Sequence, residues 1–373
     1  MTSLIPEFLN ARVSMLTLRQ KIGQMLMVGV SGLDLSRQER TLFRDYPFGG
    51  FILFKNNCSE PAQILSLCRS LWEAGKNQPP FIAIDQEGGR VHRLPQPFTH
   101  FPAAALLGRK GDPDLALRAG RAAAAELSLL GVNLDFAPVL DVDSNPNNPI
   151  IGDRSFGSTP DRVVKIASAW IRGLRAGGII PCGKHFPGHG DTEKDSHFCL
   201  PVVEKSVETL RALELTPFVH ACRERIESLM TAHVLFRSLD RDYPATLSHK
   251  IVTGILRREL GYGGVVFGDD MEMKAVTDNY GTAEAVALGI GAGVDVFMYC
   301  HDQSAAVSAF DFVVREAEKD RRLAARVEES YNRIQGLKAH YLLSFTGAGE
   351  EELNGRVAQL DHQRIVDEIQ GSL

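Results

Sequence analysis

Eight short apolar runs are distributed along the chain, and this pattern constrains the fold more than any other feature. Each run has the length of a β-strand. Most of the intervening segments, such as residues 61–75 and 206–224, have apolar residues spaced as in an amphipathic helix. The runs are residues 24–30, 50–54, 81–85, 132–139, 179–184, 228–233, 264–270 and 294–299. Alternating strands and helices predict an α/β fold with a parallel sheet, and the count of eight favours a (β/α)8 TIM-like barrel over a doubly wound sheet.

The length of the chain suits one large α/β domain or two average ones. The sequence has 373 residues, and no internal repeat, low-complexity tract or Ser/Pro-rich linker divides it. We therefore expect residues 1–373 to form a single domain, with terminal helices from about residue 303 to the C-terminus. The polar tail after residue 347 is either a short docked helix or frayed chain.

The composition argues against several classes of protein. A net charge of −5 and a pI near 6.1 are unlike nucleic-acid or anionic-membrane proteins, which usually carry a basic patch. The six cysteines form no CxxC pair, so neither a zinc knuckle nor a redox dithiol is expected. The N-terminal segment lacks the features of a secretory signal, and no run reaches the ~18 apolar residues of a membrane span. We expect a cytoplasmic protein, most simply a monomer, that needs no cofactor.

Polar residues close several of the predicted strands. They are Asp85 after the third run, Lys184 after the fifth, His233 after the sixth and Asp269 in the seventh. The carboxyl ends of the strands meet at one end of a barrel, and barrel enzymes build their active sites there. We therefore expect these side chains to lie close together around a site.

The densest chemical feature is the segment KHFPGHGDTEKDSH, residues 184–197, which contains three of the eleven histidines. Histidine titrates near neutral pH, so a loop of this composition can transfer protons. In one interpretation Asp195 orients His197, and the pair gives and takes a proton. In another, the loop holds zinc or a similar ion, and the ligands are His185, His189, Asp191 and His197. A third interpretation is that the histidines only hydrogen-bond the loop together.

A second feature is the acidic pair Asp269-Asp270 at the end of the seventh run. A carboxylate at the mouth of a strand can act as a nucleophile or stabilise a developing cation. Aspartate is also a good N-cap, and residues 271–276 read as the start of a helix. We expect Asp270 to be the cap, which leaves Asp269 as the reactive candidate.

Two further segments combine charges with glycines. Residues 84–93, IDQEGGRVHR, place an acid before two arginines, which suits hydrogen bonds to sugar hydroxyls or to a carboxylate. The Gly-Gly pair is a weak indication of a nucleotide, because neither GxGxxG nor GxxxxGK[ST] occurs. Residues 151–157, IGDRSFG, contribute Arg154 from the loop after the fourth run, where a lone arginine more often braces the loop.

Four motifs occur in the order IDQEGGRVHR, DRSFG, KHFPGHGDTEKDSH and VVFGDDMEM. Together they resemble family 3 glycoside hydrolases of the NagZ-type β-N-acetylglucosaminidase subgroup. The resemblance extends from residue 20 to residue 299 and implies a (β/α)8 barrel. It also implies that terminal β-linked N-acetylglucosamine is released with retention of configuration, through a covalent glycosyl-enzyme.

The resemblance implies roles for individual residues. Asp269 would be the nucleophile, and His197, paired with Asp195, the general acid and then the base. The residues implied to contact the hydroxyls and acetamide of the sugar are Asp85, Arg93, Arg154, Lys184 and His185. Gly268 and Met271 stand where the subgroup commonly has serine and leucine, and because neither is a reacting group, we expect tuned rather than lost activity. No metal ion is needed for this chemistry.

The length places the chain among the single-domain, cytosolic members of the subgroup. Their usual substrates are peptidoglycan fragments such as N-acetylglucosaminyl-anhydromuramic acid with or without peptide, so the expected partner is a small carbohydrate. Three other functions stay open. They are phosphorolysis of the same bond, a catalytically silent sugar-binding or sensing protein on this scaffold, and a zinc hydrolase.

Overall fold

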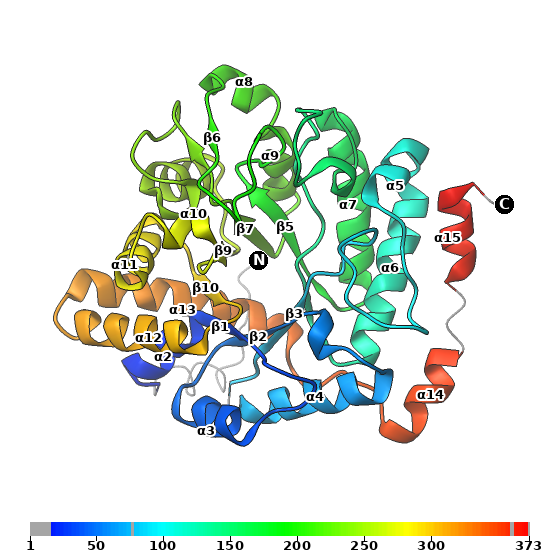
Figure 1. Ribbon diagram of the computed structural model, residues 1–373, viewed down its shortest axis with the longest axis horizontal. Helices are drawn as coiled ribbons and strands as arrows, with labels where there is room; N and C mark the ends of the chain where they lie inside the picture. The colour runs from blue at the N-terminus through cyan, green and yellow to red at the C-terminus, as the bar shows by residue number, and fades with distance from the viewer. Residues whose placement is uncertain (1–15, 76–77, 359–361, 372–373) are drawn as a thin grey trace, which may run out of the picture.

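The computed structural model describes residues 16–75, 78–358 and 362–371. Eight parallel strands close into a barrel with helices around it (Figure 1). In order around the barrel, the strands are β1 (Leu26–Gly29), β2 (Gly50–Leu53), β3 (Phe81–Ile84), β4 (Leu134–Asp135), β5 (Ile180–Phe186), β7 (Ser228–Thr231), β9 (Val265–Asp270) and β10 (Val296–Tyr299). β10 pairs with β1, with Leu26 opposite Phe297, and this pairing closes the ring. The predicted (β/α)8 barrel is confirmed, and each apolar run overlaps one strand.

Helices connect the strands and cover the outside of the barrel (Figure 1). The longer ones are α3 (Arg37–Asp45), α4 (Pro61–Ala74), α6 (Pro113–Leu129), α7 (Pro160–Ala176), α9 (Thr216–Arg223), the π-helix η4 (Lys250–Glu259) and α11 (Thr282–Ala292). Shorter ones are α2 (Leu18–Gln24), η1 (Lys55–Asn57), α5 (Ala104–Lys110), η2 (Gly152–Arg154), α8 (Val207–Ala212), η3 (Ala245–Leu247) and α10 (Lys274–Thr277).

Prolines mark where several helices begin. α4, α6 and α7 each have a proline in the first turn, where its missing N–H leaves no intrahelical bond unmade. Residues 206–224, expected to be a single helical segment, form two helices, α8 and α9, and Pro217 lies in the first turn of α9. A proline inside a helix removes a hydrogen bond and clashes with the preceding turn, so the chain starts a new helix there.

The barrel interior is a packed core. Phe81 of β3 and Phe267 of β9 meet edge to face, with ring centroids 5.8 Å apart, although their strands are not neighbours. Phe136, after β4, packs on the same ring at 5.4 Å. Such contacts cross the interior and fill it with aromatic side chains. A ligand therefore has to bind at the mouth that the loops after the strands form.

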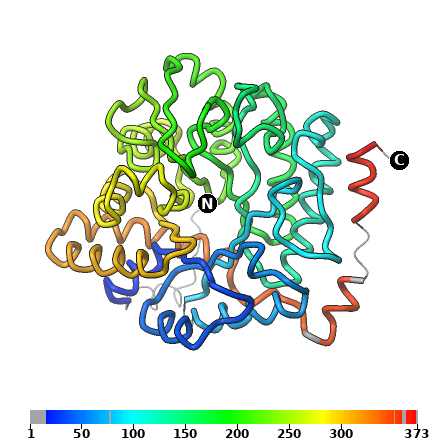
Figure 2. Tube along the Cα trace, in the orientation of Figure 1, coloured from blue at the N-terminus to red at the C-terminus, as the bar shows by residue number. Residues whose placement is uncertain are grey.

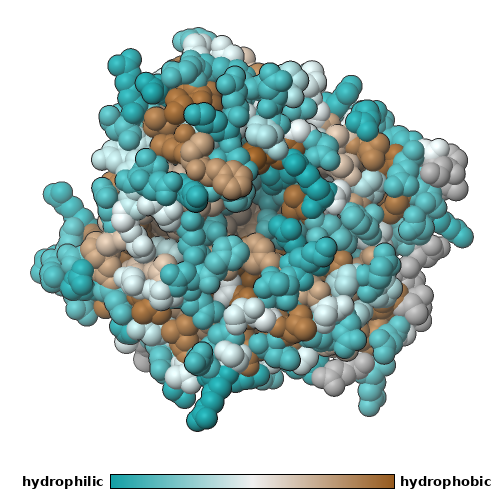
Figure 3. Space-filling model, in the orientation of Figure 1, coloured by the Kyte–Doolittle hydropathy of each residue, from teal (hydrophilic) through white to brown (hydrophobic). Residues whose placement is uncertain are grey.

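Long loops follow β4 and β5 and build part of this mouth. The chain between β5 and β7 adds β6 (Val202–Val203), which pairs with β8 (Leu235–Phe236) from the next loop. This region is the green part of the trace at the top of Figure 2. The same face is mostly hydrophilic, with apolar residues in scattered patches (Figure 3).

After β10 the chain continues as α12 (Gln303–Ala317), α13 (Arg321–Tyr341), α14 (Glu350–Ala358) and α15 (Gln363–Gln370). The polar tail contains a docked helix, because Val366 and Ile369 of α15 are buried and the helix contacts α5 and α6. Most of the N-terminal segment and the very end of the tail, whose character was predicted above, lie outside the described residues. None of the helices within the described ranges is long and apolar enough to cross a membrane.

Candidate active site

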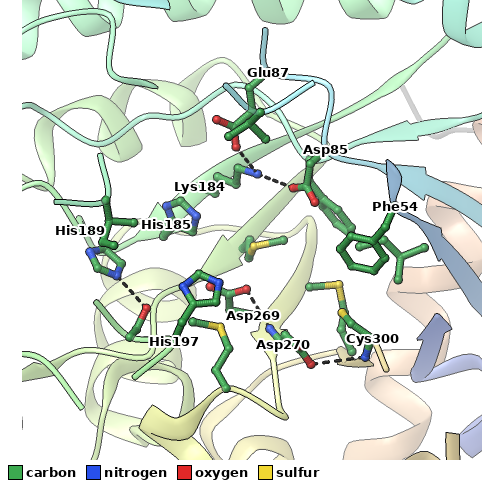
Figure 4. Close-up of a pocket in the computed structure, with 18 of the residues that line it drawn as sticks. Phe54, Asp85, Glu87, Lys184, His185, His189, His197, Asp269, Asp270 and Cys300 are labelled. Carbon is green, nitrogen blue, oxygen red and sulfur yellow. Dashed lines mark hydrogen bonds and ion pairs between the residues drawn. The ribbon is translucent and has the colours of Figure 1, made fainter. Parts of the chain in front are cut away.

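A cavity of about 230 Å³ opens at the C-terminal ends of the barrel strands. The predicted site residues that line it are Asp85, Arg93, Arg154, Lys184, His185, His197 and Asp269. Several of them converge on the cavity from different strands and loops (Figure 4). The remaining one, Asp195, reaches the cavity through its hydrogen bond to His197. The fold thus gathers at one place the residues for which the resemblance implied a catalytic or sugar-binding role.

Lys184, on β5, is the centre of a charged network in the cavity. Its ammonium group lies 2.6 Å from Asp85 Oδ1 and 2.6 Å from Glu87 Oε1, although the lysine side chain is almost fully buried. Burial alone would lower the pKa of Lys184, but the charges of Asp85 and Glu87 raise it above its ordinary value. The ammonium therefore stays charged beside the position a ligand would occupy.

Glu87 is a member of this network that sequence reasoning left without a role. Its carboxylate accepts two hydrogen bonds from Arg154, at 2.8 Å each, in addition to the contact with Lys184. Burial favours the neutral form, but Arg154 and Lys184 hold the pKa of Glu87 well below its usual range. The only signal in the sequence was a second acid two residues after Asp85.

The Gly88-Gly89 pair shapes the turn that brings Asp85 and Arg93 to the cavity. Both glycines have positive φ angles, 92° and 56°, in the region that other residues rarely adopt. A Cβ atom on Gly88 would also lie 2.8 Å from the carbonyl oxygen of Pro102. The turn leaves the Arg93 guanidinium 3.7 Å from the Asp85 carboxylate. The two glycines therefore serve a tight turn of the backbone.

His185 is held by a buried aspartate that sequence reasoning also missed. Its Nδ1 lies 2.7 Å from Asp141 Oδ2, and Asp141 Oδ1 accepts the backbone N–H of His189 at 2.7 Å. Burial would raise the pKa of Asp141, but His185 and these hydrogen bonds lower it. The ring of His189 is hydrogen-bonded by Thr192 at 2.8 Å and Ser196 at 3.1 Å. Only the folded chain brings the Asp141 loop to β5.

The residues considered as metal ligands do not converge on one point. His185 and His189 use ring nitrogens for the partners just described, and Asp191 pairs with Lys205 at 2.9 Å. Across the part of the chain that the structure describes, no group of three or more His, Cys, Asp or Glu side chains is arranged to hold a metal ion. The donor geometry gives no support to the zinc interpretation of this loop.

His197 and Asp195 form a close pair at the rim of the cavity. Asp195 Oδ1 lies 2.6 Å from His197 Nδ1 and also accepts the backbone N–H of His197 at 2.8 Å. The imidazole side chain is 62% exposed, whereas that of Asp195 is 23% exposed. Because the carboxylate occupies Nδ1, Nε2 is the nitrogen left for a substrate. The geometry is that of an oriented proton donor and acceptor.

Asp269 lines the cavity near the end of β9. Burial would raise the pKa of its carboxyl group, but the rings of His185 and His233, together with the backbone N–H of Asp270, lower it. That N–H donates to Asp269 Oδ1 at 2.8 Å. A partly exposed carboxylate that opens on the cavity and stays ionised has the properties of a nucleophile or of a group that stabilises a cation.

The expectation that Asp270 caps a helix is wrong. It is the last residue of β9, and α10 begins only at Lys274, after Met273. Its carboxylate instead accepts the backbone N–H of Glu272, at 3.1 Å, within a turn. Burial raises the pKa of Asp270 to about 6. The two neighbouring aspartates are therefore shifted in opposite directions.

Apolar and sulfur-containing side chains line the rest of the cavity. They include Ile52, Phe54, Val91, Phe136, Met230, Met273, Met298 and Cys300. The rings of Phe54, after β2, and His301, after β10, lie close together, with centroids 5.3 Å apart and planes tilted by 30°. Sequence reasoning missed both, because neither belongs to a charged motif. Their one signal in the sequence was position, since Phe54 is the last residue of the predicted strand 50–54 and His301 lies two residues beyond the predicted strand 294–299.

Residues 17–337 match the family model of the glycosyl hydrolase family 3 N terminal domain. The chain belongs to glycosyl hydrolase family 3. A β-hexosaminidase of Tolumonas auensis is 37% identical over 289 residues, which are 77% of this chain and 85% of that protein. A β-hexosaminidase of Pseudomonas aeruginosa is 36% identical over 282 residues, 75% of this chain and 83% of that one. This family 3 protein is a glycoside hydrolase.

Solved structures of other family 3 enzymes have the same fold. A family 3 β-N-acetylglucosaminidase from a Paenibacillus species superposes with a TM-score of 0.85 at 38% identity, covering 92% of this chain and 68% of that one. NagZ from Neisseria gonorrhoeae, in complex with N-trifluoroacetyl-D-glucosamine, superposes with a TM-score of 0.72 at 32% identity. That match covers 90% of this chain and 97% of NagZ.

Gly268, which precedes Asp269 in this family 3 enzyme, has room for a small side chain. A Cβ atom there would lie 3.4 Å from the Thr246 methyl group and 3.7 Å from the sulfur of Met271. These are ordinary van der Waals separations, so no close backbone approach requires glycine at this position. The serine expected from the resemblance would fit with little adjustment of its neighbours.

Glu87→Gln should destabilise the protein in a pH-dependent way, because it removes the charge shared by Lys184 and Arg154. At pH 7 we expect the free energy of unfolding to fall by about 3–5 kcal/mol, as when one member of a buried ion pair is lost. The pKa of Glu87 is lower in the folded than in the unfolded chain. The stabilisation is therefore complete above the unfolded value of about 4.3 and is lost as the pH falls.

Urea unfolding of both proteins between pH 3 and pH 8 checks this prediction. The difference between wild type and Glu87→Gln should shrink below about pH 4.3. Glu204→Gln is the control, because Glu204 is 70% exposed and pairs with an exposed arginine, so its effect should stay within about 1 kcal/mol. A large effect of Glu87→Gln that did not change with pH would contradict the proposed charge pairing.

Proposed function

We propose that this family 3 enzyme is a retaining exo-β-N-acetylglucosaminidase. The observation that carries the proposal is one cavity lined by Asp269, whose pKa is lowered, and by His197, which Asp195 holds from behind by a hydrogen bond. The names of its relatives, β-hexosaminidase and β-N-acetylglucosaminidase, support the choice of sugar. The complex of the related NagZ with an N-acylglucosamine supports it as well.

The charged network is proposed to bind one terminal sugar. Asp85 and Lys184 offer an acceptor and a donor side by side, Arg93 and Arg154 add donors, and His185 adds its second ring nitrogen, Nε2. Such paired groups suit adjacent hydroxyls, which both donate and accept, and the carbonyl oxygen of an acetamide, which accepts. The cavity, of about 230 Å³, is proposed to hold the terminal sugar that an exo-acting enzyme removes.

In the first step, Asp269 attacks the anomeric carbon and forms a covalent glycosyl ester. His197, protonated on Nε2, donates a proton to the departing glycosidic oxygen, and Asp195 stabilises the imidazolium through Nδ1. In the second step His197 takes a proton from water, which attacks the anomeric carbon and releases Asp269. Two displacements on the same carbon retain its configuration. An imidazole thus replaces the second carboxylic acid of most retaining glycosidases.

The proposed physiological substrate is a peptidoglycan fragment, N-acetylglucosaminyl-anhydromuramic acid with or without peptide, in cell-wall recycling. This choice rests on the resemblance to the NagZ-type subgroup, and the match with NagZ from Neisseria gonorrhoeae covers 97% of that chain. A single-domain, monomeric, cytoplasmic enzyme without cofactors accords with such a role. Phosphorolysis of the same bond is the second candidate, because a neutral imidazole at the acid–base position would repel phosphate less than a carboxylate does.

Purified protein should release the aryl group from an aryl β-N-acetylglucosaminide, and Asp269→Ala should lower kcat by at least ~10³-fold because the nucleophile is gone. Asp278→Ala is the matched control, an exposed aspartate on the same segment, and should behave as wild type. No release by wild type, or undiminished release by Asp269→Ala, would overturn the proposal. Sugar 1-phosphate formed in phosphate buffer would favour phosphorolysis, and saturable binding without turnover would favour a sensor.

His197→Ala should lower turnover by about 10²–10⁴-fold on substrates with poor leaving groups, because their glycosidic oxygen has to be protonated as it leaves. Activated aryl glycosides need less protonation, so their first step should be affected far less. The measurement is the rate for a series of aryl β-N-acetylglucosaminides whose phenol leaving groups have decreasing pKa. Equal losses across the series would rule out His197 as the acid.

A further inference from the structure

The C-terminal helix α15 lies beyond the residues that match the family, 17–337, and packs beside α5 and α6 (Figure 1). Two apolar side chains on it, Val366 and Ile369, are buried. The helix faces the loop that joins β3 to α5, residues 85–103, and the two form the walls of a cavity of about 440 Å³. This loop carries Asp85 and Arg93 to the active site.

A buried carboxylate on α6 connects α15 to this loop. Glu126, whose side chain is 2% exposed, accepts a hydrogen bond from Nδ1 of His362, the residue before α15, at 2.8 Å. It also accepts the backbone N–H of Thr99, at 3.2 Å and 3.0 Å to its two oxygens. A buried carboxylate is stable only while such partners hold it. Losing His362 would therefore loosen the attachment of the loop.

From Thr99 a series of contacts leads to the active site. The ring of the next residue, His100, stacks on His92 with centroids 4.1 Å apart, and its Nε2 lies 2.7 Å from the Gly89 carbonyl oxygen. His92 Nδ1 accepts a hydrogen bond from the Gln86 amide at 2.8 Å. The same Gln86 side chain accepts the backbone N–H of Arg93 at 2.9 Å.

The neutral state of His92 fits its place in this series. Burial, followed by the neighbouring His100, lowers the pKa of His92 to about 4. At neutral pH the ring is uncharged, so its Nδ1 has a lone pair that can accept the hydrogen bond from the Gln86 amide. An uncharged ring also stacks on His100 without charge repulsion. The loop between Gln86 and His100 is thus held at both ends by side chains.

We propose that His362 is a positioning residue: through Glu126 it fixes the loop of residues 85–103, and through His92 and Gln86 it sets Arg93 against the sugar. The inference rests on the proposed function for the role of Arg93. It adds a device outside the family domain that controls substrate affinity. His362 itself does not line the cavity that holds the proposed catalytic groups.

His362→Ala should raise KM for an aryl β-N-acetylglucosaminide by about three- to tenfold, the loss expected for one hydrogen bond, while kcat stays within about twofold. Amide hydrogen exchange of residues 86–100 should become faster. The variant His362→Asn should keep both KM and the exchange rates near those of wild type, because the asparagine amide nitrogen can take the place of Nδ1. Glu368→Ala, which removes the exposed pair of Glu368 with Arg118, is the control and should change neither.

A double-mutant cycle separates positioning from general loosening. In an Arg93→Ala background, His362→Ala should cause no further rise in KM, because the group that it positions is absent. Unchanged amide exchange in His362→Ala would overturn the proposal. Faster exchange with an unchanged KM would also overturn it, as would an undiminished rise in KM when His362→Ala is made in the Arg93→Ala background. If wild type hydrolyses no such glycoside, the proposed function fails, and the exchange measurement alone then decides whether His362 holds the loop.

Discussion

A buried cation, Lys184, and a partly exposed one, Arg154, share one buried carboxylate, that of Glu87, and the candidate site depends on this pairing. Lys184 comes from β5, Arg154 from η2 after β4, and Glu87 from the loop after β3, so one acid joins three parts of the barrel mouth. Without it Arg154 would lose its carboxylate partner and Lys184 would keep only Asp85, so a cation would be left unpaired in a largely desolvated place, which is strongly unfavourable. With it, Lys184 keeps its charge and remains available to Asp85 and a ligand.

Environment, more than residue type, distinguishes the carboxylates of this family 3 enzyme. The neighbouring histidine rings and a backbone N–H keep the pKa of Asp269 low, whereas burial raises the pKa of the adjacent Asp270 to about 6. Divergent environments for paired acids are typical of active sites in which each has a separate task. The proposed proton donor is set apart in a different way, since His197 lies exposed at the rim beside Asp195.

Much of this arrangement was predictable from the sequence, because strand-length apolar runs and polar residues at their ends obey local rules. All eight strands were found, and the residues for which the resemblance implied a catalytic or sugar-binding role line one cavity or, for Asp195, contact a residue that does. Partners from distant segments were not predictable. Asp141 meets His185 only when β4 and β5 pair, and the link between Glu126 and His362 joins residues 236 positions apart.

Errors in prediction arose where two local signals compete. Asp270 precedes a helical pattern and reads as an N-cap, yet strand β9 continues through it and delays the helix to Lys274. Residues 206–224 have helical periodicity throughout, yet Pro217 forces a second helix. The role of α15 was also outside the reach of sequence patterns, because its partners are set by docking. In these places, contacts between segments that are distant in the sequence decide where a helix begins or docks.

The central claim is that Asp269 forms a covalent bond to the sugar, and mass spectrometry with a fluorinated sugar tests it most directly. A 2-deoxy-2-fluoro or 5-fluoro glycoside with a good leaving group slows breakdown of the glycosyl-enzyme, so the intermediate accumulates. The account predicts a mass increase of one fluorosugar on the peptide that contains Asp269, absent in Asp269→Ala. A label on Asp270 or any other residue, or an equal label in Asp269→Ala, would contradict it.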